Sequence, residues 1–250
     1  MKTLKLIGVA LFALFSFVAC DDPTDSTENQ SASGKRLATV IRSSDMIQFK
    51  YDKNGNVIQA NEIGYSGHVE SFYYLWDSNK SITFKFDEDD EDFYKYNLTD
   101  GRITNVFYYF NADRQHDEYT YFNYNNEGHI KDFGGSSEGE IATFNWENSK
   151  LLSTGSTSFI YSNQTCNGSF PLLYLFVELW DKEDYLFMAQ PELSGIRTNH
   201  LPKMIIKGNS YVYTFEYKFD QYNYITSCTM SILNKYNDER NEEIFEFVWE

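Results

Sequence analysis

FKYDKNGNV, residues 49–57, predicts the end of one strand, a tight turn and the start of the next strand. Phe49 and Tyr51 are two positions apart, so both rings point to the same face of an extended backbone. Asp52 favours the start of a turn, and Gly55 accepts the positive φ that closes it. The valine that follows returns an apolar residue to the sheet. The segment therefore predicts one β-hairpin.

The pattern of this hairpin occurs six times: an aromatic residue, any residue, a second aromatic residue, then Asp, Asn or Glu, and an apolar residue about five positions later. Successive copies among the first five lie about 20 to 28 residues apart, which suits hairpins joined in order. Aromatic residues make up 18% of the chain, which also favours strands. The copies begin at Phe49, Tyr74, Tyr94, Phe122, Phe144 and Tyr217, and the returning residues are Val57, Ile82, Ile103, Ile130, Leu152 and Ile225.

We therefore predict a single all-β domain over residues 37–250. It is an antiparallel hairpin meander of strand-turn-strand repeats, forming a large twisted sheet, an open barrel or a layered sheet. The pattern lapses in an irregular insertion near residues 170–202, where Leu172 to Asp181 fits a short helix or a buried strand. Strand patterns resume after the insertion, and the C-terminal tail is expected to be a pairing strand. They cover Met204–Ile206, Tyr211–Phe219, Tyr224–Leu233 and Ile244–Trp249.

The repeats carry a family resemblance. The F-x-Y-D-x-x-G-x-V copies resemble the YD repeats of Rhs-type shells, and the stretch from Asn199 through Tyr217 to Ile225 is similar to the Bacteroidetes lipoproteins grouped as the domain of unknown function DUF4595. The resemblance covers roughly residues 37–250. Three copies depart from it, because Lys80, Lys150 and Asn223 replace the turn glycine. That family has no established activity, so the resemblance implies no catalytic residue.

Residues 1–19 are predicted to be a lipoprotein signal peptide. Lys2 and Lys5 precede fourteen apolar residues, Leu6 to Ala19, a run too short to span a bilayer comfortably. The closing Phe-Val-Ala-Cys resembles the lipobox of bacterial lipoproteins, so Cys20 is expected to be acylated and to become the mature amino terminus. An ordinary signal peptide cut elsewhere, or an uncleaved anchor, is the alternative. The lipid on Cys20 would hold the protein on a membrane.

Residues 20–36 are predicted to be the lipidated cysteine and a flexible acidic tether, because residues 21–34 read DDPTDSTENQSASG. Acids directly after Cys20 resemble the signals that send Bacteroidetes lipoproteins to the cell surface, and Asp25-Ser26-Thr27 resembles their O-glycosylation sequon. A solvated linker that happens to be acidic is the alternative. We expect an exported outer-membrane lipoprotein that faces the cell exterior, with the periplasmic face as the alternative.

The charge balance argues against nucleic acid as a partner. The chain has 21 basic and 37 acidic residues, and loss of the two lysines in the signal would leave a net charge of −18. Binding to phosphates needs clustered lysines and arginines, and the electrostatic field of a strongly negative protein repels a polyanion. With Cys20 assigned to the lipid, Cys166 and Cys228 form an even pair in an oxidising compartment. They either form a disulfide or stay as two separate buried thiols.

No catalytic motif stands out, and no cofactor is expected. The four histidines lack a metal-ligand spacing, so no metal site is predicted. The acidic run Asp87–Asp92 lacks the central glycine and closing glutamate of an EF-hand loop, so we interpret it as a solvated hairpin tip. Trp76, Trp146, Trp180 and Trp249 are speculative stacking aromatics for sugar rings, although a core role is the more usual one for such residues.

A binding or structural role is favoured over catalysis. The leading hypothesis is a non-catalytic surface lipoprotein that captures a glycan, a peptide or a partner protein. The alternatives are a hydrolase that uses two carboxylates in a concave sheet, and an envelope scaffolding or assembly protein. The sequence does not define the ligand, the oligomeric state or the closure of the sheet.

Overall fold

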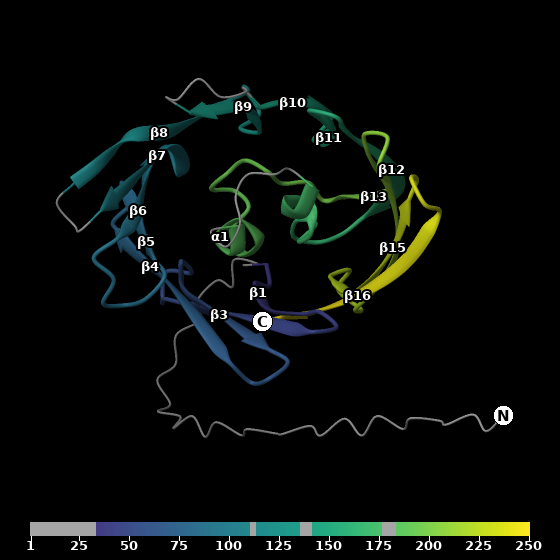
Figure 1. Cartoon of the computed structure of the whole chain (residues 1–250), viewed down its shortest axis with the longest axis horizontal. Coiled ribbons are helices and arrows are strands. Elements are labelled where there is room, and N and C mark those ends of the chain that lie inside the picture. Colours follow the sequence, from purple (N-terminus) through teal and green to yellow (C-terminus); the bar gives the residue numbers. More distant parts are fainter. Residues whose placement is uncertain (1–33, 111–113, 136–141, 177–183) are drawn as a thin grey trace, which may run out of the picture. The chain divides into compact units, whose positions relative to one another are not determined.

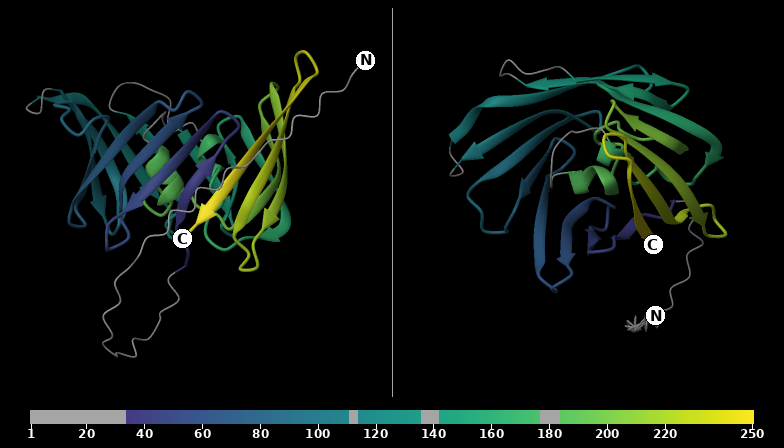
Figure 2. Two further views of the ribbon diagram at one scale, coloured as in Figure 1. Left: turned by 90° about the horizontal axis from the view of Figure 1, so that it is seen from below. Right: turned by 45° about the vertical axis from the view of Figure 1, so that its right-hand side comes forward.

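The predicted hairpins are present, and they join into a closed antiparallel barrel of sixteen strands. Each strand pairs with its neighbours in sequence, and β1 pairs with β16 to close the sheet, so the two lie side by side (Figures 1 and 2). The all-β antiparallel meander is confirmed, and the closure that the sequence left open is settled. The strands are β1 Leu37–Ile41, β2 Asp45–Tyr51, β3 Val57–Gly64, β4 Val69–Asp77, β5 Ser81–Lys85, β6 Phe93–Thr99, β7 Arg102–Phe110, β8 Arg114–Tyr124, β9 Ile130–Gly135, β10 Ala142–Glu147, β11 Lys150–Thr154, β12 Thr157–Thr165, β13 His200–Lys207, β14 Tyr211–Phe219, β15 Ile225–Asn234 and β16 Glu239–Trp249.

The computed structural model describes residues 34–110, 114–135, 142–176 and 184–250, and residues 34–250 form one compact unit. The predicted signal peptide, Cys20, the Asp25-Ser26-Thr27 sequon and Trp180 lie outside the described residues. Across the described ranges, no helix has the length and apolar character needed to cross a membrane.

Three copies of the repeat share one turn geometry. In the copy that begins at Phe49, the Oδ1 atom of Asp52 accepts hydrogen bonds from the backbone N–H groups of Asn54 and Asn56, both at 2.8 Å. Gly55 follows at φ +90°. Asn125 and Asp220 accept the equivalent pairs of bonds in their own turns. The side chain of the Asp or Asn therefore accepts hydrogen bonds from backbone N–H groups that a tight turn leaves without a backbone acceptor.

Other copies turn differently. After Asn97 the strand continues to Thr99, and Asp100 and Gly101, both at positive φ, make the turn; the prediction that Asn97 begins it is wrong. A bulge at Asn97 absorbs the difference. The fifth copy turns at Asn148 and Ser149, both at positive φ, and the buried returning residue there is Leu151 rather than the predicted Leu152, which is 38% exposed.

All six repeat turns lie at the same end of the barrel. Each connects an even-numbered strand to the odd-numbered strand that follows, and in a meander such connections share one end. The link between β12 and β13 occupies the seventh position at that end. We call this end of the barrel the repeat end, and residues 166–199, between β12 and β13, the insertion.

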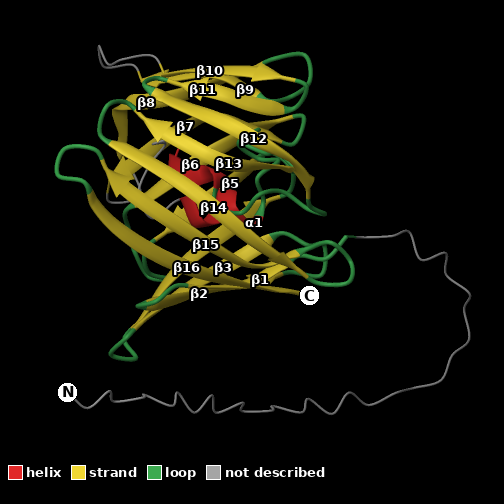
Figure 3. Ribbon diagram, turned by 90° about the vertical axis from the view of Figure 1, so that its right-hand side faces the viewer, coloured by secondary structure: helices red, strands yellow, loops and turns green. Residues whose placement is uncertain are grey.

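The inner face of the barrel is apolar. Cross-strand neighbours such as Phe49 and Ala60, Tyr74 and Phe84, or Phe215 and Met230 are buried against the interior. A closed sheet of sixteen strands encloses more space than its own inner side chains fill. The insertion occupies that space, as Figures 1 and 3 show, with the 3-10 helix η1 Leu173–Phe176 and the α-helix α1 Asp184–Ala189. The described part of the predicted Leu172–Asp181 segment is thus helical.

Aromatic rings join the insertion to the wall. Tyr185 packs edge-on against Phe72 with ring centroids 5.5 Å apart, and Phe170 meets Phe215 at 5.9 Å. Phe187 lies 6.3 Å from Tyr96. Each fully buried side chain of this size contributes about 1.5–3 kcal/mol of transfer free energy. The barrel and its insertion therefore share one hydrophobic core.

The outer face carries polar side chains that bond to one another across strands. The amide Nδ2 atoms donate from Asn97 to Asn105 at 2.7 Å, from Asn123 to Asp132 at 2.6 Å and from Asn145 to Ser153 at 2.8 Å. Asn61 accepts from Gln59 and Ser71 on the same face. These ladders occur on β3, β4 and β6 to β11. The outer face is thus built for contact with water over these strands.

Outside β6 to β8, where Phe93 pairs with Tyr109 and Phe107 with Tyr119, apolar residues on the outer face are interrupted by polar neighbours. Exposed Leu75 faces Thr83, Ile244 faces Thr229, and Val248 faces Thr39. The apolar row Ile206, Val212 and Leu233 on β13 to β15 is flanked by Ser158 on one side and Arg240 on the other. The apolar stretches therefore stay short.

Candidate ligand-binding cavity

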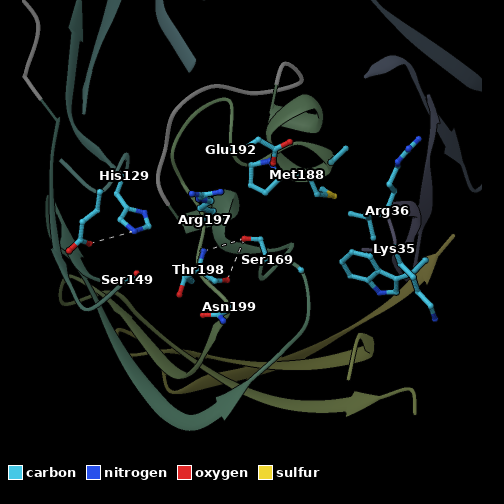
Figure 4. Close-up of a pocket in the computed structure, with 16 residues that line it drawn as sticks. Lys35, Arg36, His129, Ser149, Ser169, Met188, Glu192, Arg197, Thr198 and Asn199 are labelled. Carbon is cyan, nitrogen blue, oxygen red and sulfur yellow. Dashed lines mark hydrogen bonds and ion pairs between the residues drawn. The ribbon is translucent and has the colours of Figure 1, made fainter. Parts of the chain in front are cut away.

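A cavity of about 600 Å³ lies at the repeat end, between the insertion and the strand turns (Figure 4). The apolar part of its lining is Leu37, Met188, Ala189, Pro191 and Trp249; the neutral polar part is Ser149, Ser169, Thr198 and Asn199; and the charged part is Lys35, Arg36, Glu127, Glu192 and Arg197. Gly168 and His129 complete it. This volume suits a small molecule.

Backbone hydrogen bonds hold the insertion side of the cavity. The two arms of the insertion pair with each other, because Cys166 N–H donates to the Asn199 carbonyl and Phe170 N–H donates to the Thr198 carbonyl. The wall then bonds to the insertion: Ile103 N–H donates to the Leu193 carbonyl at 2.9 Å, and the buried Val57 N–H donates to the Gln190 side chain at 2.8 Å. The segment that carries Glu192 and Arg197 is therefore fixed at both ends.

Gly195 lets this segment approach the wall closely. It adopts φ +68°, and a Cβ atom there would lie 2.8 Å from the carbonyl oxygen of Gly128 and 2.8 Å from the nitrogen of Ile130. Both atoms are backbone atoms of the β8–β9 hairpin, so neither can move aside cheaply. A glycine is required where the insertion touches this hairpin.

Lys35 forms an ion pair, whereas the two arginines of the cavity form none with any described carboxylate. Lys35 Nζ lies 2.7 Å from Asp220 Oδ2, over the rings of Tyr222 and Tyr224. Arg36 lies over the ring of Tyr51, 5.5 Å from its centroid. Within the part of the chain that the structure describes, the side chains of Arg36 and Arg197 form neither an ion pair nor a hydrogen bond.

The two carboxylates of the cavity have different surroundings. Glu192 is exposed to the cavity, and desolvation by the surrounding protein raises the pKa of its carboxyl while the charge of Arg197 lowers it. Glu127 is largely exposed, and its Oε2 atom lies 3.9 Å from Nε2 of His129. The side chains available to a hydrolase at this site are thus these two acids and one histidine.

His129 is buried at the base of the cavity wall. Its ring stacks on Trp146 with centroids 4.3 Å apart and planes 13° from parallel. Burial, followed by the charge of Arg197, lowers the pKa of the imidazole, while Glu127 and the Gly195 carbonyl oppose the change. The imidazole is therefore held mainly in its neutral form.

The predicted stacking tryptophans share a structural contact. Trp76 Nε1–H donates to the Val57 carbonyl at 2.8 Å, and Trp146 Nε1–H donates to the Ile130 carbonyl at 2.7 Å. Trp249 Nε1–H donates to the Ile225 carbonyl at 2.7 Å. All three are half-buried, and of the three only Trp249 lines the cavity. A stacking role for any of them stays a prediction.

Cys166 and Cys228 are buried and carry free thiols. Burial raises the pKa of each thiol to about 12, so both are poor nucleophiles near neutral pH. A disulfide between them stays a prediction. The acidic run Asp87–Asp92 forms the β5–β6 turn, closed by a bond from Asp90 N–H to the Asp87 carbonyl. Among the residues described, no group of three or more His, Cys, Asp or Glu side chains is arranged to hold a metal ion.

Sequence reasoning did not single out Arg36, Glu192 or Arg197. The available signal was the lapse of the repeat between Phe170 and Pro202, because a segment that interrupts a regular series of hairpins is a natural place for a binding function. Glu192 and Arg197 gave no further indication in the sequence. They come close to Arg36 and His129 only because the barrel closes around the insertion.

Comparison with solved structures places the chain among closed antiparallel barrels. It is similar to a porin-like protein from Bacteroides uniformis, with a TM-score of 0.62 and 14% identity over 86% of this chain and 95% of that chain. It is also similar to a porin-like protein from Bacteroides vulgatus, with a TM-score of 0.53 and 13% identity over 87% of this chain and 99% of that chain. At these identities the likeness establishes the fold alone. No family model matches the sequence, and no curated protein matches it.

Proposed function

We propose that this chain is a lipid-tethered, non-catalytic binding protein of the bacterial envelope, whose barrel stands in water and holds a small molecule in the repeat-end cavity. The observation that carries the proposal is the distribution of side chains on the barrel wall. Apolar residues point inward and hydrogen-bonded amides point outward.

This distribution is the reverse of a membrane-spanning barrel. Such barrels present an apolar band to lipid, flanked by aromatic girdles, and keep their interior polar. Asn97, Asn123 and Asn145 face outward, where a bilayer-spanning sheet would present apolar side chains, and their cross-strand bonds use only part of their polar groups. The lumen also holds the shared core of wall and insertion. These features support a barrel outside the membrane.

The predicted lipid on Cys20 supplies the membrane attachment in this proposal, so the sheet itself needs none. A barrel tethered in this way is free to display a binding site. The cavity meets the requirements for one, because it is concave, has one apolar side and carries a few polar groups at fixed places.

A fragment screen by ligand-observed NMR tests the binding function. We expect fragments that bind the wild-type protein to be lost in Ala189→Trp, which fills the cavity, and kept in Ser231→Trp, which places the same indole on the exposed outer face of β15. Circular dichroism checks that both variants fold. Absence of any bound fragment, or equal binding to both variants, would contradict the proposal.

The hydrolase remains the second candidate because two carboxylates line the cavity, and burial raises the pKa of one of them. It requires that Glu127 and Glu192 act on one bond. Turnover of a glycoside that disappears in both Glu127→Gln and Glu192→Gln would favour the hydrolase over a binding protein.

A further inference from the structure

We propose that the ligand of the repeat-end cavity is a small monoanionic carboxylate, bound through Arg197. This inference rests on the proposed binding function and names the class of ligand. Among the described residues, neither Arg36 nor Arg197 has a side-chain ion pair or hydrogen bond, but Arg36 lies over the ring of Tyr51, whereas Arg197 has no such ring contact.

The charges of the cavity contrast with those of the whole chain. Acidic residues outnumber basic ones by 37 to 21, so an anion approaching most of the surface is repelled. In the cavity, three cations meet two carboxylates. Asp220 neutralises Lys35, which leaves two guanidinium groups and two carboxylates, so the cavity is far less negative than the rest of the surface.

Arg197 points into the cavity from a rigid place in the backbone. Its neighbours Ile196 and Thr198 are both 3% exposed, and the Thr198 N–H donates to Ser169 Oγ at 3.2 Å. Figure 4 shows Arg197 near the middle of the cavity, between His129 and the side that carries Glu192 and Met188. The backbone at Arg197 is therefore fixed, and its guanidinium group presents paired N–H donors that match the two oxygens of a carboxylate.

The other residues that line the cavity indicate the net charge of the ligand and the size and polarity of its remaining part. Two arginines and two carboxylates leave the cavity without net charge, so a second negative charge on the ligand would meet Glu127 and Glu192 with no further cation to offset the repulsion. Met188, Pro191 and Trp249 give the cavity an apolar side that suits a ring or short hydrocarbon body. A carboxylate on an apolar ring satisfies both sides, and benzoate is the simplest probe of this class.

Calorimetric titration of the full-length protein tests the assignment with three probes: benzoate, the neutral benzamide and the dianionic phenyl phosphate. We expect benzoate to bind at least about tenfold more tightly than either of the others. Arg197→Gln should weaken benzoate binding about tenfold and leave benzamide unchanged, and Arg197→Lys should restore part of the loss. Lys218→Gln removes one positive charge from the outer face of β14 and should leave all three affinities unchanged.

Equal affinity for benzoate and benzamide would overturn the assignment, as would benzoate binding that survives Arg197→Gln. Tighter binding of phenyl phosphate would overturn the monoanion. If fragments bind the wild-type cavity and are lost in Ala189→Trp while benzoate does not bind, the carboxylate assignment fails and the binding function stands. If no fragment binds, the binding function itself fails.

Discussion

In three copies of the repeat, the second aromatic residue both packs and forms a hydrogen bond. Its ring lies on the inner face of the barrel, and its polar tip donates to the backbone of the preceding hairpin. Trp76 reaches the carbonyl of Val57, Tyr124 reaches that of Ile103, and Trp146 reaches that of Ile130. In each case the acceptor is the returning apolar residue of the previous copy. Tyr and Trp are suited to this position because each combines a large ring with a donor.

The side chain of Asn125 should matter more than that of Asp77, although both occupy the same position of the repeat. Asn125 Oδ1 accepts two backbone N–H groups at 3.0 Å, whereas the Asp77 side chain has no hydrogen-bond partner among the described residues. We expect Asn125→Ala to lower the free energy of unfolding by about 1–2 kcal/mol. Asp77→Ala should change it by less than about 0.5 kcal/mol. Chemical denaturation measures both, and equal losses would refute this account of the turns.

His129 predicts a dependence of stability on pH. Its pKa is lowered in the folded protein, mainly by burial, so the unfolded chain takes up a proton first as the pH falls below about 6.5. The stabilisation is complete above that value and is lost as the pH falls through the lower pKa of the folded state. His129→Phe keeps a ring against Trp146 and removes the titration.

Melting temperatures at neutral pH and at about pH 5.5 check this prediction. The wild-type protein should lose more stability between the two than His129→Phe. His68→Phe, at an exposed position, should behave as the wild type. An identical loss in wild type and His129→Phe would show that His129 does not contribute.

Hairpins were predictable from the sequence because their determinants are local. Two rings with period two, an Asp or Asn and a residue at positive φ are enough to make strand, turn and strand, as Asp52 and Gly55 show. The turn after Asn97 was missed because Asp100-Gly101 offers a two-residue turn that competes with the longer one. Local preference alone does not decide between them.

The insertion was not predictable in detail because its conformation depends on the barrel around it. Its backbone reaches Ile103 and Ile130, about 60 to 90 residues earlier in the chain, and no local pattern encodes those contacts. The cavity residues follow from the same docking. The apolar character of Leu172 to Asp181 in the insertion was visible in the sequence, but periodicity could not distinguish a helix from a buried strand.

Gly195 tests how the insertion docks. Gly195→Ala adds left-handed strain and pushes a methyl group against backbone atoms of Gly128 and Ile130, so we expect a loss of roughly 3–5 kcal/mol in the free energy of unfolding. Gly67 has a similar positive φ with open space around it. Gly67→Ala should cost only about 1–2 kcal/mol. Equal losses would show that the close approach at Gly195 contributes nothing.

The barrel as a whole combines a fold seen in porin-like proteins with an apolar interior and outward-facing polar side chains on many of its strands. Closure leaves no open sheet edge, because the backbone N–H and C=O groups of β1 pair with those of β16. The insertion then fills the interior of this wide barrel with apolar side chains. The alternation of apolar and polar residues was visible in the sequence, but which face was inside became defined only when the sheet closed.

The position of the barrel relative to the bilayer can be measured by collision of spin labels in the full-length protein reconstituted in lipid vesicles. Ser71→Cys, Asn123→Cys and Ser231→Cys place labels on the outer faces of β4, β8 and β15. The native Cys166 and Cys228 are buried and should not be labelled. We predict that all three labels collide freely with a water-soluble nickel complex. Labels shielded from nickel and accessible to oxygen, as in a lipid-facing band, would contradict a barrel that stands in water.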